Sequence, residues 1–427
     1  MHKRIALLLA LVLLSVFLTA CYDSREIDDY AYVVMMGIEH GVSDRIRLTL
    51  QIPEFTNTNM SDSGGGGGGN GGDDEERAKK ENITVEAPSI FAAVAEADTF
   101  IPKTINFMHL NAVVVSEDFA SSGEMKEFVV NLLRYHEIRR NTSIIVCKGS
   151  ARDFVMAARP YLGSLVTETM EELISKADIT GYFPKLTISD FAIKVKSTYT
   201  QALTIYAALN KGDNFIEKGQ YYTGGFKAPS DFYAGDMPRT GGQEIELLGT
   251  AVFELGNMVG KLTGFETQMV ELTLGNLKRT SLTIPDPLEP ELYIPIEIKE
   301  LEPPFTHVDI KGEKPMIHTT LSLEGEIVTI PSGINYESPD MKGIVEEAVA
   351  QHIADGIKRT FAKCQTLKTD VFEYGTEAVR HFWTIQEWEN YNWRQKFSEA
   401  SLMLHVDFTL RRTGRFIETA PVQEEKK

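Results

Sequence analysis

Strand-like and helix-like segments are intermixed along most of this chain, and the intermixing limits the folds that it can adopt. Residues 45–52 alternate polar and apolar side chains with the period of two that a half-buried strand shows. Residues 110–115 form a strongly apolar run typical of a strand, and residues 123–134 carry apolar side chains at helical spacing. The sequence therefore predicts an α+β fold with mainly antiparallel sheets flanked by helices.

The same patterns identify the other elements. Further strands are expected at residues 32–38, 143–147, 202–209, 244–254, 261–262, 293–300, 307–311, 318–323 and 402–411. Further helices are expected after a cap at Ser89, at 151–159 after a cap at Ser150, and at 165–176, 189–196, 264–274 and 341–368.

About three α/β domains are expected, because domains commonly contain about 100 to 200 residues. They are an N-terminal domain over residues 21–200, a middle domain over 201–284 and a C-terminal domain over 285–420. The polar, glycine-rich residues 210–243 and the proline-rich residues 285–290 read as linkers. No internal repeat of 20 to 50 residues is visible.

Residues 57–82 contain a glycine run followed by four acidic residues. Gly64, Gly66 and Gly69 match the GxGxxG pattern of phosphate-binding loops, but no helix opens there and no GK[ST] follows. The segment is therefore expected to be a flexible insertion in the first domain.

The first twenty residues have the pattern of a secretory signal peptide. Lys3 and Arg4 precede an apolar run over residues 5–18 that only Ser15 interrupts. This run is shorter than the about 20 apolar residues that a membrane span needs. Residues 1–20 are therefore expected to be removed.

The segment Leu18-Thr19-Ala20-Cys21 resembles the bacterial lipobox, in which small residues let a peptidase cut before a diacylglyceryl-cysteine. Only a thiol can form that thioether, so we predict lipid attachment at Cys21 on the outer face of the cytoplasmic membrane. The alternative is an ordinary signal peptide with a chance cysteine near the cut. Two acyl chains hold a protein stably, whereas one binds only marginally.

The net charge argues against binding to nucleic acid and against electrostatic binding to a membrane. Cleavage before Cys21 removes two of the 43 basic residues and none of the 61 acidic ones, which changes the formal charge from -18 to -20. Anionic lipid headgroups and nucleic-acid phosphates both repel such a chain. Nucleic acid is therefore not expected among its partners, and its membrane contact is expected through the lipid.

No pattern of catalytic or metal-binding residues emerges. The sequence lacks HExxH, HxxxH and GxSxG. His109 is expected beside an apolar strand and His136 on a helix, both as structural residues. Cys147 and Cys364 are expected to be buried packing residues. The neighbouring acids Glu168, Glu171 and Glu172 could mimic a glycosidase pair, but chance neighbours are expected among 61 acidic residues. We predict no catalytic, cofactor-binding or metal-binding residue.

All three tryptophans lie within residues 381–394. Trp383, Trp388 and Trp393 are five positions apart, so each step turns a helix by about 140° and they cannot share one helical face. Packing against neighbouring strands, a partner interface and a membrane-interface belt are the three interpretations.

These segments together resemble the Ger(x)C lipoproteins, the C subunits of spore germinant receptors. The resemblance spans nearly the whole mature chain in the expected order. It rests on Cys21 to Asp29, Met108-His109-Leu110 to Ser116-Glu117, Arg134 to Arg139, Gly249 to Phe253, Met258 to Leu262, Glu266-Thr267, Gln365, Asp370 to Gly375 and Trp388 to Trp393. Two departures are the glycine run and Tyr22, which stands where tryptophan is usual.

The resemblance implies a non-catalytic subunit of a nutrient germinant receptor, with three mixed α/β domains. It would sit on the inner membrane of the dormant spore with a multi-spanning A subunit and a transporter-like B subunit. The rival hypotheses are a solute-binding lipoprotein of a transporter and, less favoured, a cell-wall hydrolase. The lack of repeated β-α alternation argues against the solute-binding protein.

Overall fold

The computed structural model describes residues 4–5, 27–53, 80–162, 166–218 and 227–412. Cys21 and most of the signal segment and of the glycine-rich insertion at residues 57–82 lie outside the described residues. What the sequence predicts for them stays a prediction.

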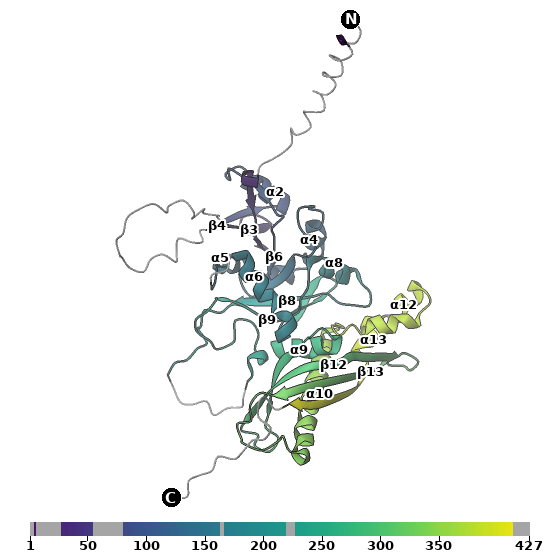
Figure 1. The fold of residues 1–427 in the computed structure, drawn as a ribbon. Coiled ribbons are helices and arrows are strands. Elements are labelled where there is room, and N and C mark those ends of the chain that lie inside the picture. Colours follow the sequence, from purple (N-terminus) through teal and green to yellow (C-terminus); the bar gives the residue numbers. More distant parts are fainter. Residues whose placement is uncertain (1–3, 6–26, 54–79, 163–165, 219–226, 413–427) are drawn as a thin grey trace, which may run out of the picture.

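An eight-stranded sheet in the order β10-β9-β8-β7-β6-β2-β3-β4 forms the larger part of the fold (Figure 1). Its strands are β2 (Met35–His40), β3 (Ile46–Pro53), β4 (Lys80–Ala87), β6 (Ala112–Ser116), β7 (Ser143–Cys147), β8 (Leu203–Leu209), β9 (Ile245–Glu254) and β10 (Asn257–Leu262). The central strands β2, β6, β7 and β8 run parallel, and the outer pairs are antiparallel. Parallel neighbours need long crossovers, which the intervening helices supply.

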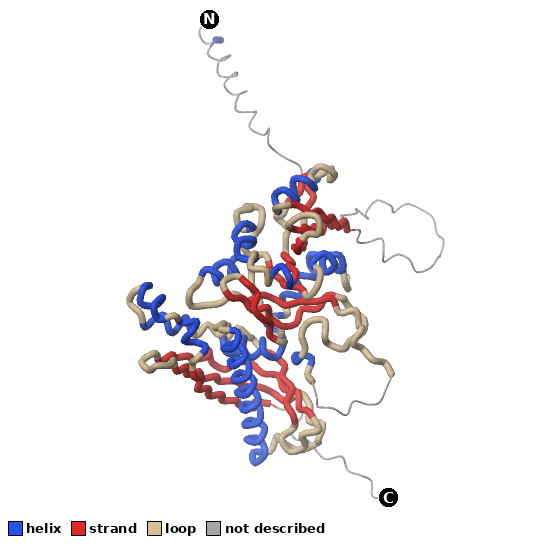
Figure 2. Tube along the Cα trace, turned by 180° about the vertical axis from the view of Figure 1, so that it is seen from behind, coloured by secondary structure: helices blue, strands red, loops and turns tan. Residues whose placement is uncertain are grey.

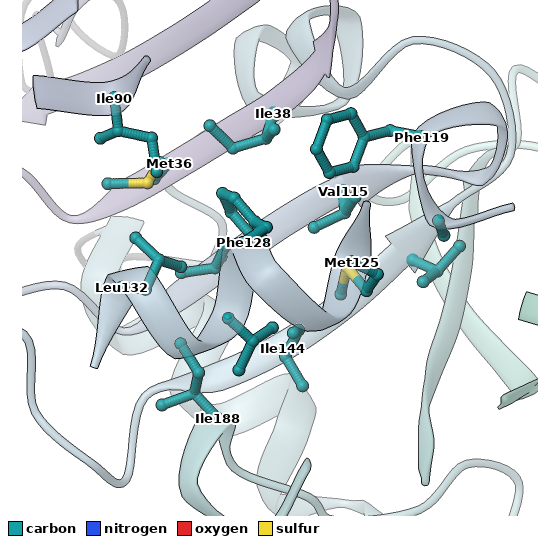
Figure 3. Close-up of a cluster of buried hydrophobic side chains, with 14 of the residues drawn as sticks. Met36, Ile38, Ile90, Val115, Phe119, Met125, Phe128, Leu132, Ile144 and Ile188 are labelled. Atoms are coloured by element: carbon teal, nitrogen blue, oxygen red, sulfur yellow. The ribbon is translucent and has the colours of Figure 1, made fainter. Parts of the chain in front are cut away.

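Helices cover both faces of these central strands. On one face, Phe128 of α4 (Met125–Leu132) packs among strand residues that include Val115 (Figure 3), together with α2 (Ile90–Ala97) and α8 (Ile188–Lys196). On the other face, Phe154 of α5 (Ala151–Ala157) and Met170 of α6 (Val166–Ser175) pack with Val114. Burial on both faces explains why these strands read as continuous apolar runs.

A second sheet of four strands, here named the small sheet, has the order β11-β12-β13-β14. Its strands are β11 (Thr280–Pro285), β12 (Tyr293–Asp309), β13 (Met316–Ile327) and β14 (Ser401–Arg412). The long helix α10 (Pro339–Leu367) packs on this sheet (Figure 2), and α9 (Gly264–Leu274) contacts both β9 and β12. Leu203 and Val252 of the large sheet share one apolar cluster with Ile296 and Ile353. The two sheets therefore pack through a continuous core.

Shorter elements connect these layers. They are η1 (Ile27–Asp29), β1 (Tyr30–Tyr32), β5 (Thr104–Asn106), α3 (Glu117–Ala120), α7 (Ala177–Thr180), η2 (Pro229–Asp231), α11 (Gly375–Ala378), η3 (Val379–His381), α12 (Ile385–Tyr391) and α13 (Trp393–Ser398). β1 and β5 form a separate parallel pair.

The predicted α+β class is confirmed, although the centre of the large sheet is parallel. The helix expected at residues 264–274 is α9, and Ser89 and Ser150 cap α2 and α5 as expected. The strand expected at 32–38 is interrupted after Tyr32, because the Val33 and Val34 amides bond to Asn106 and Gln51. The strands expected at 293–300 and 307–311 are one strand, β12, with register shifts between Glu300 and Phe305 around two prolines.

The segment expected as a middle domain contributes to both sheets. β8, β9 and β10 extend the large sheet because β8 pairs with β7, whereas β11 pairs with β12. The prediction of a linker at residues 285–290 is wrong, because these residues form the turn of the β11–β12 hairpin. Asp286 within this turn is buried and accepts hydrogen bonds from Ser332 and Tyr336. Division of the chain into independently folding domains stays a prediction.

Candidate functional site

The predicted lipid site, Cys21, lies outside the described residues. The next described segment begins with η1, which lies at the end of the molecule opposite the small sheet (Figure 1). Among the described residues, no helix is both long enough and apolar enough to cross a bilayer.

The remaining cysteines are packing residues, as expected. Cys147 in β7 and Cys364 in α10 are buried free thiols. Burial raises the pKa of both thiols above the ordinary value, which suppresses the reactive thiolate.

The two histidines singled out from the sequence are both exposed. The His109 ring meets Tyr32 edge-on, with 4.8 Å between the ring centroids. His136 lies in an exposed turn and not on a helix as expected, because α4 ends at Leu132. In the described part of the chain, no three or more His, Cys, Asp or Glu residues form a group that could hold a metal ion.

The three tryptophans have two different environments. Trp388 and Trp393 are only 3% and 2% exposed, whereas Trp383 is 97% exposed. The packing interpretation is therefore confirmed for Trp388 and Trp393. Trp383 is available to a partner.

Trp393 is held by a buried acid, Asp370. The Asp370 carboxyl group accepts hydrogen bonds from Trp393 Nε1 at 2.9 Å and from the backbone amides of Gly375 and Tyr374 at 2.6 and 3.2 Å. Burial raises the pKa of Asp370 to about 7, although these three donors oppose the rise. In the sequence, Asp370 stood out only as part of the segment Asp370 to Gly375. Its position between apolar segments was the signal that could have marked it.

The end of α8 and the segment after it connect this aromatic cluster to the helices of the large sheet. Lys194 Nζ lies 2.6 Å from Glu373 Oε1, and Thr198 Oγ1 accepts a 3.0 Å hydrogen bond from Trp388 Nε1. Gln201 Oε1 accepts the Asp370 amide hydrogen at 2.8 Å. These contacts fix the base from which the exposed Trp383 projects.

The backbone around Trp383 is held by an N-terminal cap of α12. The Glu387 carboxylate accepts hydrogen bonds from the amides of Trp383 and Thr384 at 3.1 and 3.2 Å. The residue just before a helix cap often packs on the fourth residue of the helix, and in α12 these two residues are Trp383 and Trp388. Phe382 does so instead, with 5.4 Å between ring centroids, and Trp383 and the 77% exposed Ile385 are left on the surface.

A polar cluster lies where the large sheet meets the C-terminal helices. Lys261 of β10 donates hydrogen bonds to Tyr206 Oη at 2.7 Å and to Glu117 Oε1 at 3.1 Å, and Tyr206 donates to Glu117 Oε2 at 2.7 Å. Burial and the bond to Glu117 raise the pKa of Tyr206 above its ordinary value. Lys261 also lies over the ring of Tyr233, 5.4 Å from its centroid.

Lys363 of α10 extends this cluster. Its Nζ donates to Glu266 Oε2 at 2.6 Å and to Tyr233 Oη at 3.1 Å. Burial disfavours the ammonium, yet the bonds to Glu266 and Tyr233 raise the pKa of Lys363 above its ordinary value. Since a nucleophilic lysine needs a lowered pKa, this arrangement suits a structural cross-link between α9 and α10.

Two carboxyl groups, the buried Glu271 and the half-buried Glu300, were not identified from the sequence. Burial raises the pKa of both Glu271 and Glu300 to about 7. Glu271 accepts a 2.8 Å hydrogen bond from Asn276 beside a cavity of about 220 Å³. By contrast, the acids that drew attention in the sequence, Glu168, Glu171 and Glu172, are exposed on α6.

Comparisons with known proteins agree with the resemblance seen in the sequence. A family model described as the spore germination protein N-terminal domain matches residues 23–208. A second, described as spore germination B3/GerAC like, C-terminal, matches residues 248–414.

Full-length relatives and a solved structure point the same way. The chain is 23% identical over 422 residues to spore germination protein KC of Bacillus subtilis (strain 168), covering 96% of both chains. It is 22% identical over 406 residues to spore germination protein B3 of the same organism, covering 92% of this chain and 94% of the relative. The crystal structure of the GerBC protein has a similar fold, with a TM-score of 0.51 at 15% identity, covering 88% of this chain and 96% of that chain.

The two family matches follow one another over most of the chain, and the relatives align from end to end. The chain therefore belongs to the Ger(x)C family of spore germination proteins.

Proposed function

We propose that this protein is a non-catalytic lipoprotein subunit of a nutrient germinant receptor, which acts by assembling with membrane-embedded A and B subunits. Family membership supports the role in germination. The observation that carries the assembly role is Trp383, a 97% exposed tryptophan held on an ordered, capped helix start. Exposed tryptophans are enriched at the centres of protein interfaces.

The anchor in this proposal is lipid on Cys21, with the protein on the outer face of the spore inner membrane. Tethering replaces a three-dimensional search with a high local concentration, so modest interfaces suffice for assembly. The lipobox-like residues Leu18 to Cys21 support the anchor.

A pair of variants in spores tests the two parts separately. Cys21→Ala should release the protein from spore membranes and impair nutrient germination. Trp383→Ala should leave the protein on the membrane but reduce co-purification of the A and B subunits. Full germination with a wholly soluble Cys21→Ala protein would exclude the anchoring role, and undiminished co-purification with Trp383→Ala would exclude the tryptophan surface.

A further inference from the structure

A groove of about 770 Å³ lies beside the start of the described segment at residues 27–53. Ile27 and Tyr30 line it from η1 and β1, and Phe100 and Ile101 line it from the turn after α2. Ile27 is 75% exposed and Phe100 58% exposed. Two large apolar side chains from separate segments therefore face solvent in one groove.

The groove has a fixed place in the fold. β1 pairs in parallel with β5, with Tyr30 opposite Thr104, and the Val33 amide donates a 2.9 Å hydrogen bond to Asn106 O. This pairing joins both walls of the groove. The small sheet and α10 lie at the opposite end of the molecule (Figure 1).

Chain length restricts what this groove can meet. Ile27 follows Cys21 by six residues, and six residues span at most about 20 Å when fully extended. A lipid on Cys21 would therefore keep the groove close to the bilayer surface. Apolar side chains and tyrosines are the residue types that enter the headgroup region of a membrane.

We propose that this groove is the membrane-facing surface of the protein, with Ile27 and Phe100 inserted into the lipid interface and the small sheet pointing away. The inference rests on the proposed lipid attachment at Cys21. Asp28, Glu81 and Lys103 also line the groove. Since two acids face one base, the groove is not basic, and its contact does not require anionic lipid. Insertion at this second point fixes an orientation that a single tether leaves free.

Labelling with an environment-sensitive fluorophore tests the proposal. The full-length lipoprotein, with Phe100→Cys, is labelled and reconstituted into phosphatidylcholine vesicles. The native Cys147 and Cys364 are buried, so the label is directed to the introduced thiol. The matched control is Phe305→Cys, which replaces a 67% exposed phenylalanine on β12. Both labelled variants must melt at the wild-type temperature.

In the vesicles, the emission of the label at position 100 should shift to shorter wavelength. Its intensity should fall severalfold when the vesicles also carry shallow doxyl lipid. The label at position 305 should do neither. Equal responses at both positions in protein that floats with vesicles would overturn the proposed orientation. Shielding of position 100 from aqueous iodide without quenching by doxyl lipid would assign the groove to a protein contact instead, and would also overturn it. Failure of unlabelled protein to float with vesicles would contradict lipid attachment at Cys21 itself.

Discussion

Trp393 Nε1 donates a 2.9 Å hydrogen bond to Asp370 Oδ2, and both side chains are buried where the C-terminal helices meet residues 194–201. The same carboxylate oxygen accepts the Gly375 amide hydrogen, and Oδ1 accepts that of Tyr374. One acid thus organises the turn before α11 and positions an indole 23 residues later.

Removing this acid should destabilise the fold. Asp370→Ala leaves the Trp393 indole N–H and two buried amides without their acceptor, so we expect a loss of about 2–4 kcal/mol in the free energy of unfolding. Chemical denaturation measures it. Asp407→Ala, at an exposed position of β14, is the control and should change stability by less than about 0.5 kcal/mol. If Asp370→Ala unfolded at the same denaturant midpoint as the wild type, these hydrogen bonds would contribute little to the free energy of unfolding.

Gly375 is expected to tolerate no side chain. A Cβ atom there would lie 2.2 Å from Tyr199 O and 2.7 Å from Trp393 Nε1. Gly375→Ala should therefore cost about 3 kcal/mol or more, because the backbone must move. The matched control is Gly343→Ala in α10, where no atom lies within 4 Å, and it should stabilise the helix by about 0.5–1 kcal/mol. Similar melting temperatures for the two variants would contradict this prediction.

Stability should fall as pH rises from about 4.5 to about 7. Burial raises the pKa of Glu271 from 4.5 to about 7, so the folded protein keeps a proton that the unfolded chain releases in this range. The stabilisation is complete below pH 4.5 and is lost as pH passes 7. Glu271→Gln should flatten the dependence in part, since Glu300 and Asp370 have raised pKa values in the same range. Denaturation at several pH values measures this, with Glu171→Gln on the exposed face of α6 as the matched variant.

The ion pair of Lys363 with Glu266 should couple α10 to α9. The atoms are 2.6 Å apart, and the side chains are 30% and 22% exposed. We expect a double-mutant cycle with Lys363→Met and Glu266→Gln to give a coupling free energy of about 1 kcal/mol. The more exposed pair of Arg380 and Glu377, with side chains 67% and 31% exposed, provides the comparison and should couple more weakly. Additive effects at the inner pair would exclude it as a cross-link.

Two tryptophans five residues apart should respond differently to truncation. Trp388→Ala removes a buried ring and should cost about 3–5 kcal/mol. Trp383→Ala should change the free energy of unfolding by less than about 0.5 kcal/mol, because the ring is 97% exposed. Thermal denaturation of the purified variants separates the two cases. A large loss of stability in Trp383→Ala would mean that the ring supports the fold instead of remaining free for a partner.

Local physical chemistry was sufficient to predict many elements from the sequence. Capping residues predicted where α2 and α5 begin, and Ser89 and Ser150 do cap these helices. Alternation predicted β3, and the short apolar segment before Cys21 predicted an exported lipoprotein. These features depend on neighbours within a few positions, which a single sequence displays.

Tertiary structure decided what distant segments do together. β8 belongs to the large sheet because it pairs with β7, which is far away in sequence. Residues 285–290 form a hairpin turn because the strands on either side of them pair with each other. The spacing of the tryptophans could exclude a shared helical face but could not say which ring is covered. Phe382 packs on Trp388 and Asp370 bonds to Trp393, and neither contact follows from the spacing of the tryptophans. Burial depends on the three-dimensional packing of side chains and not on their order in the chain.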